Sequence, residues 1–453
     1  MGLQRLQEAR ADAHRQAPLS LSDDPTPLIE PRPFSCMIRT ALVGISGYGR
    51  WHLLMAMEQA LLGRLKLVGV TVINREEQDG LCRRLERKGI RLFDSYEAMM
   101  TALAGEVDLV MIPTGIHWHA SMTLAALAAG AHVLVEKPLA PTLAEADAII
   151  AAQEAAGRMV AVGYQDLYVP LAHELKRRIL AGEIGRLERV VVRGQWPRTA
   201  GYFQRNAWAG RLQVDGRWVL DSPVANAYAH FLMMALFWAG SAAEEAATVE
   251  TLEAELYRAA PIESFDTCCL RAVTTQGAEV LFYGTHAGSA DLPPEIELRG
   301  DRGTITWRYE RTCTIRRSGR SDEVLPVPDQ LDTRLCVLDA VLDRLEGRDR
   351  FIVKPRLARA HTRLMNALHE FFPVTTICLP DLERNGAGPE TSVRIRAVDK
   401  AIAAAAERGV LFGETGVKWA SAVTTVRRLN GYERFSGCCD GGFCAAVSPL
   451  TAG

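Results

Sequence analysis

The stretch HVLVEKP at 132–138 places an acid and a base directly behind an apolar run. The run predicts a buried strand, and in open α/β sheets ligands bind outside the carboxyl ends of the strands. Glu136 and Lys137 therefore stand where a ligand is expected. A lysine at such a place can polarise an oxygen or relay its proton, most readily if burial lowers the pKa of its amine. The alternative is a surface ion pair, which contributes little stability.

A glycine-rich turn, TALVGISGYGR at 40–50, ends another apolar run and opens a stretch with helical spacing. Glycines in such a turn let backbone N–H groups and the helix N-terminus approach a pyrophosphate. The match to the G-x-G-x-x-G template is imperfect because a serine takes the middle position, and a tight structural turn is the alternative. We expect a dinucleotide here, held by Gly44, Ser46, Gly47, Tyr48 and Gly49.

The end of the second predicted strand bears on the choice between NAD and NADP. An acid is expected there to bind the ribose 2′-hydroxyl, but the sequence has Asn74 and Arg75 instead. Asn74 can still form a hydrogen bond, and Arg75 can meet a 2′-phosphate or simply lie in solvent. We therefore expect NAD or NADP, with both residues among those that bind the cofactor.

Strand-like and helical stretches alternate from residue 37 to 165, which predicts βαβ units and a doubly wound parallel sheet. Beyond 166, strand-like runs joined by short turns favour an antiparallel sheet with helices packed on one face. The predicted class is α/β, with a doubly wound nucleotide-binding domain at 37–165 and an α+β domain at 166–428. Residues 1–36 and 429–453 are interpreted as disordered extensions, and either Met1 or Met37 as the natural start.

Composition excludes several classes of partner. The chain has 453 residues and a formal net charge of −2, so nothing in its charge favours nucleic acid or an anionic membrane surface. No apolar run approaches the roughly 20 residues that span a bilayer, and a cytoplasmic location is expected. The cysteines do not form paired C-x-x-C motifs at zinc spacing, so no metal is expected.

Several motifs together resemble the Gfo/Idh/MocA family of glucose-fructose oxidoreductase and inositol dehydrogenase. They are VGISGYGRWH at 43–52, MIPTGIHWHA at 111–120, EKP at 136–138, VGYQDLYVP at 162–170 and ELYRAAPIESFDT at 255–267. The resemblance implies a Rossmann domain followed by a domain with a large, mostly antiparallel open sheet. It also implies a nicotinamide cofactor, a homodimer or homotetramer built on that sheet, and sugar, polyol or cyclitol substrates.

The resemblance also implies roles for single residues. Lys137 would be catalytic, preceding a cis-proline, with Glu136 near the nicotinamide ribose and Thr114 and His117 beside the cofactor. The family's D-x-x-x-H pattern corresponds to Asn226 and His230, so an asparagine replaces the expected aspartate. His230 would act as general acid or base with Lys137. Further substrate-binding candidates are Gln165, Tyr202, Asn226 and Asp221, which could supply the missing carboxylate from the helix start.

These features favour an NAD(P)-dependent oxidoreductase that reversibly oxidises a sugar-, polyol- or cyclitol-like alcohol to a ketone. One alternative is a glycosidase or lyase that uses bound NAD to oxidise the sugar transiently, since the same residues serve that chemistry. Another is a non-catalytic nucleotide-binding protein, which the asparagine at position 226 favours. The retained Lys137 and His230 argue against this last class.

Overall fold

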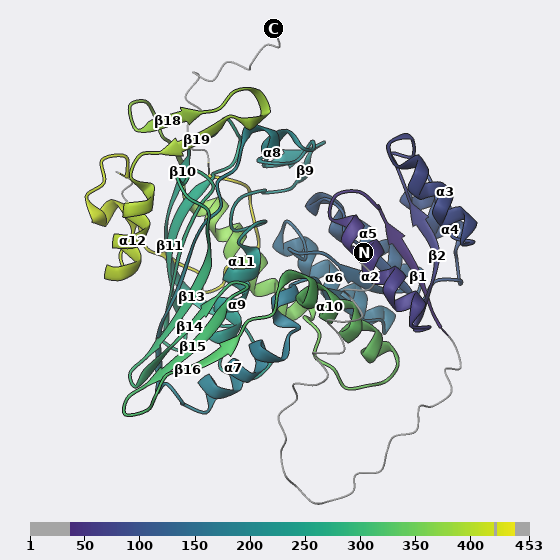
Figure 1. Cartoon of the computed structure of the whole chain (residues 1–453), viewed down its shortest axis with the longest axis horizontal. Coiled ribbons are helices and arrows are strands. Elements are labelled where there is room, and N and C mark those ends of the chain that lie inside the picture. The colour runs from purple at the N-terminus through teal and green to yellow at the C-terminus, as the bar shows by residue number, and fades with distance from the viewer. Residues whose placement is uncertain (1–36, 421–423, 440–453) are drawn as a thin grey trace, which may run out of the picture. The chain divides into compact units, whose positions relative to one another are not determined.

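The computed structural model describes residues 37–420 and 424–439, all within the unit of the chain that starts at Met37 (Figure 1). The predicted N-terminal extension, residues 1–36, lies outside the described residues. Two large sheets form the framework of the unit, one early in the chain and one later. No helix in the described ranges combines the length and apolarity needed to cross a membrane.

The first sheet has six parallel strands in the order β3-β2-β1-β4-β5-β6. This order is that of a Rossmann sheet, whose ligand crevice lies where the chain reverses direction between β1 and β4. The strands are β1 (Ile38–Val43), β2 (Leu65–Thr71), β3 (Arg91–Phe93), β4 (Leu109–Ile112), β5 (His132–Val135) and β6 (Val160–Val162). The connecting helices are α2 (Gly49–Leu61), α3 (Asp79–Arg87), α4 (Tyr96–Ala102), α5 (His119–Ala128) and α6 (Leu143–Ala156).

Local sequence explains why these elements form. Every residue of β4 is buried, as continuous apolar strands covered on both faces must be. Helix α6 begins at Thr142, whose side chain accepts a hydrogen bond from the Glu145 N–H. It ends at Gly157, which adopts the left-handed conformation that glycine allows at a helix C-terminus.

The second sheet has ten strands in the order β16-β15-β14-β13-β7-β12-β11-β10-β17, with β20 paired to β10. All neighbours are antiparallel except the pairs β7–β12 and β10–β17. The strands are β7 (Leu187–Gln195), β10 (Val249–Arg258), β11 (Thr267–Thr274), β12 (Glu279–Thr285), β13 (Leu292–Gly300), β14 (Gly303–Arg308), β15 (Thr312–Arg317), β16 (Glu323–Pro326), β17 (Val374–Thr376) and β20 (Arg427–Arg428). A Rossmann sheet followed by a large, mostly antiparallel sheet confirms the predicted fold class.

Helices cover both faces of the second sheet (Figure 1). The face towards the Rossmann sheet carries the apolar helix α9 (Ala229–Trp238) and, behind it, α11 (Pro355–Phe371), which also packs on α6. Helix α10 (Gln330–Leu345) contacts α2, and α7 (Pro170–Leu180) contacts α9. On the opposite face, α12 (Val398–Arg408) and the 3-10 turn η5 (Phe412–Thr415) bury side chains of β7, β10, β11 and β12. The prediction of helices on one face is thus wrong for this part of the sheet.

The chain end differs from the tail expected to begin at 429. Leu429 is fully buried, its carbonyl accepts a hydrogen bond from Arg363, and the Cys439 N–H donates to the carbonyl of His369. Residues 429–439 therefore pack on α11, while 440–453 lie outside the described residues. The remaining short elements are η1 (Glu76–Gln78), η2 (Ile116–Trp118), η3 (Gln165–Leu167), α8 (Ala200–Gln204), β8 (Gln213–Val214), β9 (Arg217–Trp218), β18 (Leu382–Asn385), η4 (Gly388–Glu390) and β19 (Ser392–Ile395).

Candidate active site

Glu136 and Lys137 lie at the carboxyl end of β5, and the Lys137–Pro138 bond is cis, as the resemblance implies. The Glu136 side chain is buried, and its Oε1 lies 2.9 Å from the Nε2 of His52 in α2. Gly163, at the end of β6, makes room for this carboxylate, since a Cβ there would lie 2.5 Å from Glu136 Oε1. A buried carboxylate held by a histidine is therefore built into the strand end.

Lys137 crosses from the Rossmann sheet to the second domain. Its Nζ donates to the backbone carbonyl oxygen of Asn226 at 2.8 Å and to the Asn226 Oδ1 at 3.1 Å. Burial lowers the pKa of Lys137, Glu136 and Asp221 oppose this shift, and the positive charge of Arg205 adds to it. An ammonium has three donors, so the two oxygens of Asn226 leave one for another ligand.

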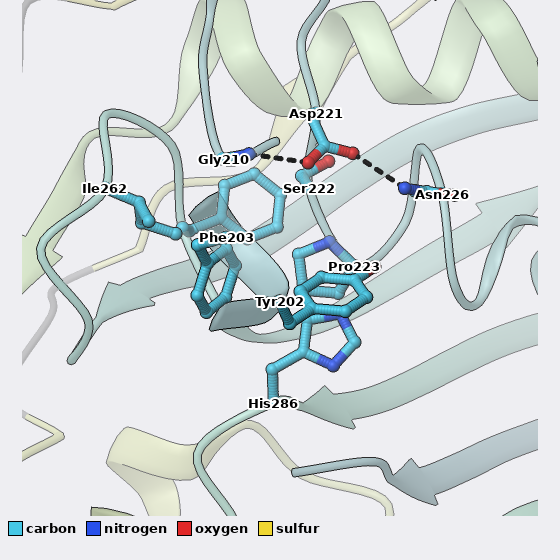
Figure 2. A pocket seen from close by; sticks show the side chains of 10 residues that line it. Tyr202, Phe203, Gly210, Asp221, Ser222, Pro223, Asn226, Ile262 and His286 are labelled. Atoms are coloured by element: carbon cyan, nitrogen blue, oxygen red, sulfur yellow. Dashed lines mark hydrogen bonds between the residues drawn. The ribbon is translucent and has the colours of Figure 1, made fainter. Parts of the chain in front are cut away.

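Asp221 supports this lysine through Asn226 rather than directly. Its Oδ1 accepts a hydrogen bond from Asn226 Nδ2 at 3.0 Å, and its Oδ2 accepts one from the Gly210 N–H at 2.6 Å (Figure 2). Burial raises the pKa of Asp221, while these two donors and the positive charge of Arg205 counteract the shift. The carboxylate missing at position 226 therefore lies one hydrogen bond further from the lysine, and the asparagine orients its carbonyl oxygen to Nζ.

His230 lies in α9 and is neutral at physiological pH. Burial lowers its pKa well below the usual range, and the positive charges of Lys137 and Arg334 reinforce the effect. Its Nδ1 lies 3.4 Å from the Asp166 Oδ2 but has no partner in hydrogen-bonding geometry. Burial raises the pKa of Asp166 to about 7. A neutral imidazole beside a carboxyl that can ionise is an arrangement able to accept a proton.

The glycine-rich turn has the conformation that phosphate binding requires. Gly44 and Gly47 have φ values of +88° and +53°, which side chains rarely adopt. A Cβ at Gly49 would lie 2.5 Å from the carbonyl oxygen of Gly44, so the helix starts where only glycine fits. Ser46 contributes a carbonyl oxygen that accepts from the Gly49 N–H, closing the turn.

Tyr48 connects this turn to the second domain. Its hydroxyl donates to the Gln165 Oε1 at 2.9 Å, and Gln165 Nε2 donates to the hydroxyl of Thr333 in α10 at 3.0 Å. Gln165, expected to touch substrate, is thus buried beneath the turn and uses both ends of its amide there. The next residue of α10, Arg334, places its guanidinium over the Trp51 ring, 4.2 Å from the centroid, and over Tyr48 at 5.5 Å.

The ribose end of the predicted cofactor site has no acid at the end of β2. Asn74 donates to Glu77 at 2.7 Å, and Arg75 forms ion pairs with Asp94 at 2.8 Å and with Glu86 at 3.8 Å. Arg75 therefore already has carboxylate partners, which a 2′-phosphate would have to compete with.

The strand end after β4 presents polar atoms without partners. Thr114 Oγ1 and His117 Nδ1 are buried and form no hydrogen bond within the described part of the chain. His119 behaves differently, because its ring nitrogens meet the carbonyl oxygens of Pro138 at 2.7 Å and Thr114 at 3.2 Å. His119 thus ties the ends of β4 and β5 together, and the unpaired atoms beside it fit a polar ligand such as a dinucleotide.

Sequence reasoning missed several contributors to this site. One of them is Asp166, the acid beside His230. It lies in the motif VGYQDLYVP, which already carried the resemblance, and this position was the signal that could have identified it. Other contributors are separated by long stretches of sequence, and no local signal marks them: they are His52, Arg334, His286 and His361. His361 accepts a hydrogen bond from the hydroxyl of Tyr164, whose ring packs edge-on against His230.

Comparisons with known proteins agree with this architecture. Residues 38–164 match the model of an oxidoreductase family described as having an NAD-binding Rossmann fold. The chain is 32% identical over 143 residues to an inositol 2-dehydrogenase of Paracoccus denitrificans, covering 31% of this chain and 41% of that protein. It is 31% identical over 151 residues to the scyllo-inositol 2-dehydrogenase (NAD(+)) of Bacillus subtilis, covering 33% and 42%. These matches span about two fifths of each relative.

Solved structures resemble the chain over a longer stretch. The WlbA dehydrogenase of Bordetella pertussis, in complex with NADH and UDP-GlcNAcA, superimposes with a TM-score of 0.60. It covers 73% of this chain and 95% of its own, at 23% identity, which supports the shared fold of both domains. The family match shows that residues 38–164 are similar to the NAD-binding Rossmann domain of this oxidoreductase family, whose curated relatives include inositol dehydrogenases.

Proposed function

We propose that this protein is an NAD(P)-dependent oxidoreductase that interconverts a sugar-, polyol- or cyclitol-like alcohol and its ketone. The observation that carries the proposal is the partly buried Lys137 ammonium, held by Asn226 with one donor left over, at the carboxyl end of a Rossmann strand. The unpaired polar atoms of Thr114 and His117 lie at the neighbouring strand end. Both strand ends face the crevice where such sheets bind dinucleotides.

The residues that would hold the cofactor come from both domains. The pyrophosphate fits the turn of Gly44, Gly47 and Gly49 at the N-terminus of α2. Arg334 has no carboxylate within ion-pairing distance among the described residues, so its charge is available to this turn. The nicotinamide, once bound, supplies a carbon that accepts or donates hydride. NADP would additionally require Arg75 to exchange its carboxylate partners for a 2′-phosphate.

The chain's own residues would handle the proton. The free donor on Lys137 would bind and polarise the substrate oxygen, and the lowered pKa of this lysine favours proton exchange. His230 is neutral and would accept the proton or return it, with Asp166 stabilising the imidazolium as it forms. Because both groups would act on one substrate oxygen and the charge of Lys137 already lowers the pKa of His230, their titrations would be coupled and would show shared macroscopic pKa values.

A panel of sugars, inositols, polyols and their keto derivatives with both cofactors tests the proposal. We expect Lys137→Ala to lower kcat by roughly 100- to 10,000-fold while NADH still binds, as measured by its fluorescence. Lys88→Ala, which removes an exposed lysine, serves as the control. Turnover by Lys137→Ala equal to that of the wild type would refute the mechanism, and failure of both cofactors to bind would refute the whole proposal.

The sugar glycosidase or lyase that regenerates its cofactor remains the second candidate, because Lys137 and His230 serve that chemistry equally. Product formed without net reduction of the cofactor would favour it. Cofactor binding without any turnover across the panel would instead favour a non-catalytic nucleotide-binding protein.

We further propose a cytoplasmic homodimer or homotetramer that uses the outer face of the second sheet and binds neither nucleic acid nor membranes. Helix α12 covers part of that face, so contact between copies would use the side near β13 and β14. There, Arg193 and Arg308 both pair with Glu295. Light scattering of the purified protein gives the oligomeric state, and a monomer at all concentrations would contradict this assembly.

A further inference from the structure

Two arginines flank one aromatic ring beside the candidate active site. The guanidinium carbon of Arg205 lies 3.6 Å from the centroid of the Tyr202 ring, and that of Arg198 lies 4.5 Å from the same centroid. Arg205 also lies near Trp208, and Arg198 near Trp196. The aromatic faces hold both cations in place, as cation–π contacts do.

Neither arginine has a carboxylate partner. Within the described residues, no acid lies at ion-pairing distance from Arg198 or Arg205, although Arg211 on the same segment pairs with Glu263 at 3.0 Å. The Nε of Arg198 is buried and forms no hydrogen bond. Two like charges held around one ring repel each other, and a shared anion would remove that cost.

The arginine pair adjoins the part of the second domain that holds Lys137. Tyr202 lines a small cavity of about 10 Å³ together with Asp221, Asn226 and His286 (Figure 2). In Figure 2, the Tyr202 and His286 rings lie on the side of this cavity opposite Asp221. The positive charge of Arg205 lowers the pKa of Lys137, so these two cations lie close enough for one molecule to contact both.

The nearby ionisable groups offset at most one of the two charges, because Asp221 is a single carboxyl that interacts with Arg205. Both oxygens of Asp221 accept hydrogen bonds, from Gly210 and Asn226, and burial raises the pKa of this acid. His286 is neutral, because burial and the positive charge of Arg198 lower its pKa to about 3. Burial raises the pKa of Tyr202, so it too remains neutral. A net positive charge thus persists at this side of the site.

Backbone hydrogen bonds fix the segment that carries the two arginines to its neighbours. Arg198 N–H donates to the His286 carbonyl oxygen at 3.0 Å, which fixes the start of the segment against the second sheet. Ala200 N–H donates to the Thr391 carbonyl oxygen at 2.7 Å, and a Cβ at Gly201 would lie 3.1 Å from the carbonyl oxygen of Pro389. Helix α8 therefore rests on the β18–β19 hairpin and its η4 turn.

We propose that Arg198 and Arg205 form a subsite for an anionic group of the substrate, a carboxylate or a phosphate remote from the carbon that is oxidised. The inference rests on the proposed function, because it assigns a substrate class to the same site. Guanidinium groups match both anions in geometry. One N–H group of Arg205 donates to the Tyr202 carbonyl oxygen, and its remaining N–H groups, together with those of Arg198, are the donors that would bind the anion. Neutral sugars and polyols would lack this contact.

The test compares three matched ligands: a neutral aldose, the corresponding uronic acid and the corresponding 6-phosphate. Binding to protein saturated with NADH is measured by calorimetry, and kcat/KM with NAD or NADP is measured separately. We expect one of the two anionic ligands to bind roughly 10- to 100-fold more tightly than the neutral one. Which one does so distinguishes a carboxylate from a phosphate.

Variants assign the preference to the arginines. Arg205→Gln and Arg198→Gln should each remove most of the preference for the anion and leave the affinity for the neutral sugar unchanged. The side chain of Arg205 is exposed, so its replacement should not disturb folding. The control Arg211→Gln should keep the preference. Equal binding of all three ligands by the wild type, or loss of neutral and anionic binding together in both variants, would overturn the proposal.

Binding and turnover separate this inference from the proposed function. Arginine-dependent binding of an anion without hydride transfer from any ligand would support the subsite and contradict the oxidoreductase assignment. Hydride transfer with the same kcat/KM for neutral and anionic substrates would support the assignment and contradict the subsite.

Discussion

Asp166→Asn offers a direct test of the environment built around His230. The carboxyl is 4% exposed, and burial raises its pKa from 3.8 to about 7. A raised pKa means that the folded state binds a proton that the unfolded state has released. The stability contributed by the protonated carboxyl is therefore fully present below about pH 3.8 and is lost as the pH rises through about 7.

The full difference in pKa corresponds to roughly 4 kcal/mol, at about 1.4 kcal/mol per pH unit. Between about pH 5 and about pH 8, the wild type should lose roughly 2 to 3 kcal/mol of unfolding free energy relative to Asp166→Asn. Asparagine has no proton to release, so the variant should lack this pH dependence. Urea unfolding of both proteins across this pH range measures the difference.

Asp349→Asn is the matched control, because the side chain of Asp349 is fully exposed. This variant should follow the wild type at every pH. If Asp166→Asn also keeps the pH dependence of the wild type, the Asp166 carboxyl does not titrate near pH 7 in the folded protein, and its raised pKa is refuted. In turnover, Asp166→Asn should lower kcat by about 10-fold or more, because the imidazolium loses its counter-charge.

Three further changes probe the framework. Gly49→Ala should weaken NADH binding about 10-fold or more, because the added Cβ would collide with the carbonyl oxygen of Gly44. Gly80→Ala is the control, because a Cβ there meets open space, and equal NADH affinity of the two variants would contradict the prediction. Asp221→Ala should lower kcat roughly 10-fold with little change in NADH affinity, because Asn226 loses the acceptor that orients it towards the lysine; unchanged kcat would refute that link. Arg64→Ala should lower the unfolding free energy by roughly 1 to 3 kcal/mol, because this mostly buried guanidinium pairs with two acids of α10 and with Glu346, which follows the helix. An unchanged urea midpoint would show that these pairs contribute nothing.

The comparison of sequence and structure is most informative at Asn226. The sequence shows an asparagine where the resembling family has an aspartate, and it places Asp221 nearby without saying what the acid contacts. In the structure, Asp221 acts on Asn226, and Asn226 acts on Lys137. The geometry of a short irregular segment decides this order, and residue spacing alone does not predict it.

At Gln165 the sequence suggested a functional contact, whereas the structure shows a structural one. Its place in a family-like motif suggested contact with substrate, but the amide bridges Tyr48 and Thr333, which are far away in the chain. The position of α12 on the second sheet could not be predicted from the sequence either, because the pattern of an amphipathic helix does not specify which face of which sheet the helix packs on.

What the sequence alone determined is local. Apolar runs of strand length, helical spacing and positions where only glycine fits predicted the Rossmann sheet, its phosphate turn and the charged end of β5, because each depends on neighbouring residues. What only the tertiary structure decided is how distant segments meet: Lys137 with Asn226, His230 with Asp166, and Tyr202 with two arginines that form no ion pair in the described ranges. Burial and charge at these meetings set the pKa values on which the proposed chemistry depends, and both arise only when the chain is folded.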